Sequence, residues 1–269
     1  MQYLLLFFAI FIFPLSLYAS DTRYYDVEII MYEQLQAENL GAEQWQVNIE
    51  REVPEVFIEL NSELPKQLNL PENILPELSF RKLPSTAYRL SEEATTIEES
   101  PGHHVLLHTA WVQPGLPQDA SINVHINKTF PAGHSNDFNN KNQETTLQAP
   151  AIISSSGTLD ALIRISLARY LHIETDVFLS YDESPRTINY TELQSNQTNE
   201  PPLTQSWPKQ YHIKQTRNRI RSTELHYLDH PVLGMLILFT PHEVVVKNNP
   251  VNKTGSTGKP GEKTTSTRK

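Results

Sequence analysis

A long stretch of alternating apolar and polar residues, Leu159 to Tyr181, constrains the fold more than any other feature. Apolar side chains occupy most odd positions of this stretch, and polar side chains occupy most even positions. A period of two residues is typical of a β-strand with one face in the core and one face in solvent. The stretch is far longer than the usual strand of about 5–6 residues. We therefore expect either one long bent strand or two strands joined near Arg169.

Other segments also have the composition of strands. These segments are Tyr25–Tyr32, His104–Val112, Ser121–Ile126, Ile213–Tyr227 and Val232–Phe239. His104–Val112 and Val232–Phe239 are apolar on both faces, which predicts strands covered on both sides, with Trp111 in the core. A short helix is expected to begin near Ser91 and to end before Pro101. Together these patterns predict an α+β fold, mainly antiparallel sheet with few short helices and long polar loops.

The N-terminal residues indicate export. Leu4–Leu17 is an almost unbroken apolar run, and small residues at Ala19 and Ser20 suit cleavage before Asp21. The run is too short to span a bilayer comfortably, which favours a cleaved signal peptide at residues 1–20. No Lys or Arg precedes the run, so an uncleaved anchor remains the alternative. The chain has no Cys, which excludes disulfides and thiolate sites, so a real apolar core must hold the exported domain at residues 21–246.

Charge is distributed unevenly along the chain. Residues 247–269 carry five Lys, one Arg and one Glu, a net charge of +5, which leaves −14 of the total of −9 for the rest. The tail is rich in Gly, Ser, Thr, Lys and Pro, a composition typical of disorder. An acidic body offers no basic face for phosphates, which argues against a nucleic-acid partner.

Arg217, Arg219 and Arg221 alternate along one predicted strand. On a regular strand they would project from one face about 7 Å apart, a spacing at which guanidinium groups can bind successive carboxylates. Trp207 lies between Ser206 and Pro208 in a polar stretch, so we expect an exposed ring that could stack on a sugar. The alternative for the three arginines is pairing with the many carboxylates of the same chain.

A second group of polar residues is expected to form a structural network. Its members are Arg169, His172, Glu224, His226, Asp229 and His230. Arg169 interrupts an otherwise apolar strand face, where a buried guanidinium would need a carboxylate partner. His226 and His230 could bind zinc together on a helix, but Pro231 stops the segment and Tyr227 stands where a zinc protease has its Glu. We therefore expect no metal and no cofactor.

Several of these segments resemble the signature segments of the CsiV family. The segments are Tyr25–Ile30, Val105–Pro114, Arg169–His172 and Arg219–Pro231, and they occur in the family's order. The resemblance implies a periplasmic protein that binds peptidoglycan and is needed for cell shape, with a role beside the wall-synthesis machinery. It supplies no catalytic residues, so we expect a non-enzymatic protein without stable membrane insertion. The alternative is an interaction scaffold that acts on a periplasmic wall synthase or its activator and does not touch the wall.

Overall fold

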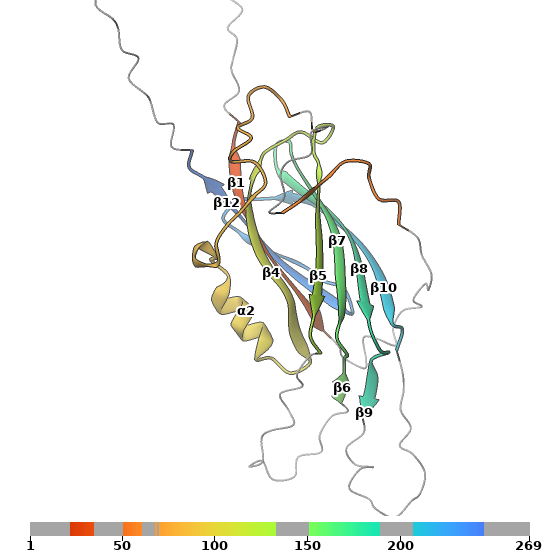
Figure 1. Ribbon diagram of the computed structural model, residues 1–269. Helices are drawn as coiled ribbons and strands as arrows, with labels where there is room; N and C mark the ends of the chain where they lie inside the picture. The colour runs from red at the N-terminus through yellow and green to blue at the C-terminus, as the bar shows by residue number, and fades with distance from the viewer. Residues whose placement is uncertain are drawn as a thin grey trace, which may run out of the picture.

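The computed structural model describes residues 22–34, 51–60, 68, 70–132, 151–188 and 207–244 (Figure 1). The signal peptide predicted at residues 1–20 and the basic tail predicted at residues 247–269 lie outside these ranges.

The described strands form two five-stranded sheets and one two-stranded sheet. The first sheet has the order β11 (Leu225–Leu228), β12 (Leu233–His242), β1 (Tyr24–Gln34), β4 (His103–Pro114) and β3 (Arg81–Lys82). The second has the order β10 (Gln210–Ile220), β8 (Leu171–Tyr181), β7 (Gly157–Leu167), β5 (Asn123–Phe130) and β2 (Phe57–Glu59). The small sheet pairs β6 (Ala151–Ile153) with β9 (Arg186–Ile188).

The described residues include one α-helix, α2 (Ser91–Glu98), and one 3₁₀ turn, η1 (Ser85–Ala87). β2 runs parallel to β5, whereas the other pairings among the described strands are antiparallel. This mainly antiparallel architecture with little helix confirms the predicted fold class.

The alternating stretch forms the hairpin of β7 and β8, two strands joined near Arg169, as predicted. Along β8 every odd residue from Leu171 to Tyr181 is buried, and every even residue is partly exposed. The period of two in the sequence therefore corresponds to one core face and one solvent face.

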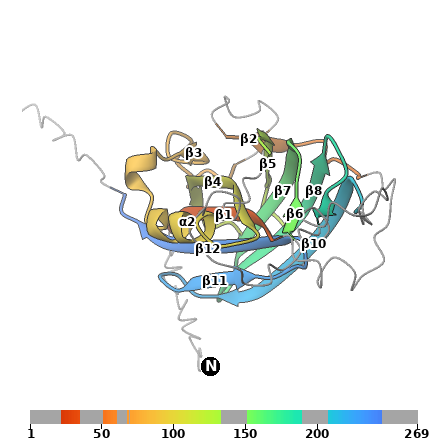
Figure 2. The same ribbon diagram turned by 90° about the horizontal axis from the view of Figure 1, so that it is seen from below.

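The core lies between the two large sheets, and the first sheet is also covered on its other side (Figures 1 and 2). Trp111 of β4 is fully buried in the main core, as expected. On the opposite face of the first sheet, Ile30 and Tyr32 pack with Leu90 and Ile97 at α2. The apolar character of β1 and β4 on both faces follows from this coverage.

The chain passes between the two large sheets after β1, β2, β4 and β10. The expected strand Ile213–Tyr227 is therefore wrong as a single element: β10 ends at Ile220, a turn follows, and β11 joins the other sheet. Thr223 in this turn has a positive φ of 68°. Figure 2 shows β10 and β11 side by side, although they are not hydrogen-bonded neighbours in one sheet.

Candidate ligand-binding site

The three arginines of the predicted site lie where the chain leaves the second sheet for the first. Arg217 and Arg219 are on β10, and Arg221 follows it in the turn. A register shift between Arg217 and Ile220 places two residues, Asn218 and Arg219, opposite one residue of β8. Two residues facing one is the pattern of a β-bulge. Arg219 has a φ of 60°, a left-handed conformation that residues other than glycine rarely adopt.

The bulge corrects the expectation that the three guanidinium groups project from one strand face. Before it, the core-facing positions of β10 are Tyr211 and Ile213, and Arg217 has the same parity. After it, Ile220 takes the core-facing position. Arg219 therefore lies on the opposite face of β10 from Arg217, because an extra residue reverses the alternation.

All three arginines are exposed, but their pairing differs. The Arg217 Nη1 donates to the carbonyl oxygen of Tyr227 at 3.2 Å. Arg221 contacts the carboxylate of Glu224 at 3.4 Å, with both side chains more than half exposed. Within the part of the chain that the structure describes, no carboxylate pairs with Arg217 or Arg219. The alternative of internal pairing therefore holds for Arg221, and such an exposed pair contributes about 0–1 kcal/mol to stability.

A cleft of about 540 Å³ opens between β10 and β11, and we call it the seam cleft. Its lining residues are Gln215, Thr216, Arg217, Tyr227, Leu228 and Asp229. Two side chains of β10 reach backbone carbonyls across it: Arg217 bonds to Tyr227, and the Gln215 amide donates to Asp229 at 2.6 Å. Side chains thus join the two strand edges here in place of a backbone ladder.

Asp229 is held in its ionised form. The Tyr227 hydroxyl donates to Asp229 Oδ1 at 2.6 Å, and the Gln34 amide donates to the same oxygen at 2.8 Å. These hydrogen bonds keep the pKa of Asp229 below its usual value. Burial and the bond to Asp229 raise the pKa of the Tyr227 hydroxyl, so it remains a donor. The cleft therefore carries a fixed anion on its β11 side and a cation on its β10 side.

The histidines of the predicted structural network make local hydrogen bonds. The ring of His172 contacts the side chain of Asn218 at 2.8 Å, within the bulge. His226 contacts the carbonyl of Arg221 at 3.1 Å, and the His230 ring accepts from the Val232 N–H at 3.4 Å. The segment is a strand followed by a turn, so the helical spacing that zinc would need is not formed. Among the described residues, no cluster of three or more His, Asp or Glu side chains could hold a metal ion.

The expected burial was wrong for one residue of this network, Arg169, and for one predicted ligand-binding residue, Trp207. Arg169 lies exposed in the turn between β7 and β8, where its guanidinium stacks near the ring of Tyr170 at 5.6 Å. Trp207 is only 7% exposed and belongs to the main core, and its backbone N–H donates to the Pro185 carbonyl at 2.9 Å. Arg169 therefore needs no buried partner, and Trp207 is no open platform for a sugar.

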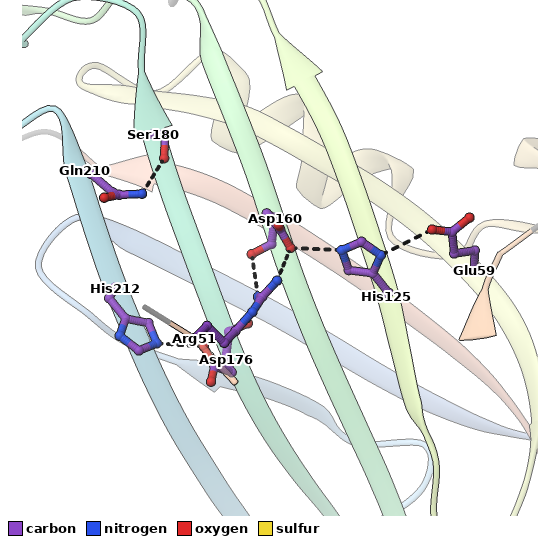
Figure 3. Close-up of polar contacts among 8 residues, drawn as sticks. All are labelled: Arg51, Glu59, His125, Asp160, Asp176, Ser180, Gln210 and His212. Atoms are coloured by element: carbon purple, nitrogen blue, oxygen red, sulfur yellow. Dashed lines mark hydrogen bonds and ion pairs between the residues drawn. The ribbon is translucent and has the colours of Figure 1, made fainter. Parts of the chain in front are cut away.

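A charged network on the outer face of the second sheet was missed from the sequence (Figure 3). Arg51 lies across the sheet with a side chain only 6% exposed, and its Nη2 pairs with Asp160 at 2.6 Å. Its Nη1 reaches the Asp176 carbonyl at 3.2 Å, and its guanidinium lies over Phe178 at 5.3 Å. The polar even positions of β7 and β8 pointed to such a face, but nothing local to Arg51 linked it to them.

Two histidines extend this network on either side of Arg51. His125 contacts Asp160 at 3.0 Å, and His212 contacts Asp176 at 2.7 Å. Figure 3 shows these side chains in a row across β5, β7, β8 and β10. Each carboxylate of the row already has a partner within the chain. We therefore infer that the network is structural and attaches residues 51–60 to the second sheet.

Comparison with known protein families identifies the family of this chain. Its sequence matches the family described as "Peptidoglycan-binding protein, CsiV" over residues 1–242. The chain belongs to the CsiV family. Comparisons with curated proteins and with solved structures gave no match.

The CsiV match covers both large sheets and the whole seam cleft. The family description names binding to peptidoglycan, which implies a cell-envelope protein, and it indicates no catalytic activity. In the described part of the chain, no helix has the length and apolar character needed to cross a membrane.

Proposed function

We propose that this protein is a non-catalytic periplasmic protein that binds peptidoglycan and supports wall synthesis and cell shape. The wall contacts it through the exposed arginines at the end of β10, chiefly Arg217 and Arg219. Family membership supports the ligand, and the absence of carboxylate partners for these two arginines among the described residues supports the location.

The chemistry of the ligand suits this location. The peptides of peptidoglycan carry several carboxylates, and a guanidinium group binds a carboxylate through two parallel hydrogen bonds. Each charge-assisted contact of this kind contributes about 1.5–3 kcal/mol. The remaining domain is acidic, so attraction is local to the arginines and weakens as salt screens the exposed charges.

Sedimentation with purified wall sacculi tests the proposal. A change of Arg217 and Arg219 to Ser should weaken binding at least tenfold, about 1.4 kcal/mol or more. A change of Arg81 and Lys82 to Ser is the matched control, because it removes two exposed positive charges from the other edge of the first sheet. The control should bind like the wild type, and both variants should keep the circular dichroism spectrum and melting temperature of the wild type.

Equal sedimentation of the arginine variant and the wild type would contradict the location. No sedimentation of the wild type would contradict wall binding itself. It would favour the alternative of a scaffold for a wall synthase or its activator, to be sought by crosslinking in the periplasm.

A further inference from the structure

Arg217 and Asp229 present opposite charges to one cleft without pairing with each other. Each is held in place by hydrogen bonds within the chain. Asp229 receives both of its described side-chain hydrogen bonds on Oδ1, and Arg217 uses Nη1 for the Tyr227 carbonyl. Among the described residues, no Lys or Arg side chain pairs with Asp229, and no carboxylate pairs with Arg217.

The contacts across the seam cleft fix the relative places of the two charges. Arg217 lies opposite Tyr227, and Gln215 lies opposite Asp229. The cation and the anion are therefore offset by two residues along the strands, roughly 7 Å. A ligand that satisfies both must carry a carboxylate and an amine at a similar separation.

Tyr227 and Leu225 add apolar surface beside the two charges. Both side chains belong to β11 and are unusually exposed for their type, at 39% and 47%. They share the strand parity of Asp229, so they lie on the same side of β11. A short aliphatic chain between the amine and the carboxylate of a ligand would contact this surface.

Peptidoglycan offers such a group in its uncross-linked stem peptides. A free stem peptide ends in a carboxylate and carries a free amine on its diamino acid. Each cross-link joins the amine of one stem to the carbonyl group before the last residue of another stem, and that last residue is released. One stem thus loses its free amine, and the other loses its original terminal carboxylate. We propose that the seam cleft binds uncross-linked stem peptides, with the carboxylate on Arg217 and the amine on Asp229. The inference rests on the proposed function, because it names which part of peptidoglycan the site recognises.

Titration with defined soluble peptides tests this selectivity without sacculi. The probes are an uncross-linked stem tetrapeptide, the same peptide acetylated on its side-chain amine, and the same peptide amidated at its C-terminus. The wild type should bind the free peptide at least tenfold more tightly than either derivative. Chemical-shift changes measured by NMR report the affinities.

Two conservative variants assign the two contacts. Asp229→Asn still accepts from Tyr227 and Gln34, and it should bind the free and acetylated peptides equally. Arg217→Gln still can donate to the Tyr227 carbonyl, and it should bind the acid and the amide equally. Glu224→Gln is the control, because this exposed carboxylate lies in the turn between β10 and β11 but does not line the cleft. It should keep the discrimination of the wild type.

The outcomes separate this inference from the proposed function. If the wild type sediments with sacculi but does not discriminate among the three peptides, the inference is overturned and wall binding stands. If the wild type discriminates as expected but does not sediment with sacculi, the peptide site stands and wall binding fails. If Asp229→Asn retains the preference for the free amine, the assignment of the amine to Asp229 is overturned.

Discussion

Glu28 and Glu33 lie on the same strand, but their carboxyl groups face opposite sides of the first sheet. Burial raises the pKa of Glu28, but hydrogen bonds from His108 and from two backbone N–H groups outweigh it and give a net lowering. Burial dominates at Glu33 and raises its pKa, although Ser154 and Tyr181 donate to it at 2.6 and 2.8 Å. Because alternate positions of a strand face opposite sides of the sheet, the two glutamates lie in different electrostatic environments.

Glu33→Gln should make the protein more stable at high pH. A raised folded-state pKa means that the native state favours protonated Glu33. The contribution of Glu33 to the free energy of unfolding is therefore fully present below about pH 4.5. That contribution is lost as the pH rises through the folded value. A neutral Gln avoids the loss, so the variant should gain on the order of 1 kcal/mol relative to the wild type between pH 4.5 and pH 8. Urea denaturation at several pH values measures the difference.

The exposed Glu77 provides the comparison for Glu33. Glu77→Gln removes one carboxyl group from the surface and so measures the effect of the change in net charge alone. A difference from the wild type that does not change with pH for Glu33→Gln would show that Glu33 binds protons equally in the folded and unfolded states.

The bulge in β10 is the element on which the candidate site depends. It ends the regular pairing with β8, places Arg219 in a left-handed conformation and leads into the turn to β11. A left-handed conformation costs a residue with a side chain roughly 1–2 kcal/mol, which surrounding structure must offset. A bulge that re-aims a charged side chain is a common device beside binding sites.

Arg219→Gly separates backbone strain from charge at this bulge. Glycine adopts a positive φ without strain, and this relief offsets its greater loss of chain entropy on folding. The folding free energy should therefore stay within about 1 kcal/mol of the wild type, while sacculus binding falls at least threefold. Arg219→Val should instead lower the melting temperature, because a β-branched residue resists a positive φ. A stable Val variant would show that the left-handed conformation is not maintained in solution.

The strands and the core were largely predictable from local patterns, whereas the site was only partly so. Alternation identified β7 and β8, and apolar composition on both faces identified β4 with Trp111. One extra residue at Arg219 leaves no periodic signal in so polar a strand, so the bulge was missed. The burial of Trp207 depends on residues distant in the sequence. The state of Asp229 likewise depends on Gln34, at the far end of β1.

At the scale of the whole molecule, two sheets and one flanking helix leave few faces free for a ligand. The first sheet is covered by the second on one side and by α2 with residues 78–90 on the other. The second sheet carries Arg51 and its charged network across its outer face. The edges where β10 and β11 meet remain open, and there Arg217 and Arg219 lack carboxylate partners among the described residues. The acidic body as a whole disfavours an anionic polymer, so binding must depend on where its positive charges lie.

Residues 247–269 carry the largest net positive charge of the chain outside the seam cleft. Removal of this segment leaves a chain with a net charge of −14 in place of −9. We expect the melting temperature to change by less than about 2 °C, because a Gly, Ser, Thr and Lys segment has little apolar area to bury. Sacculus binding should fall about threefold or more at 10 mM salt, and the loss should vanish near 1 M salt, where charges are screened within about 3 Å.

A variant with the five Lys of the segment changed to Gln should behave like the truncation, because the effect comes from charge and not from length. A drop in melting temperature well beyond 2 °C on truncation would show instead that the segment packs on the domain.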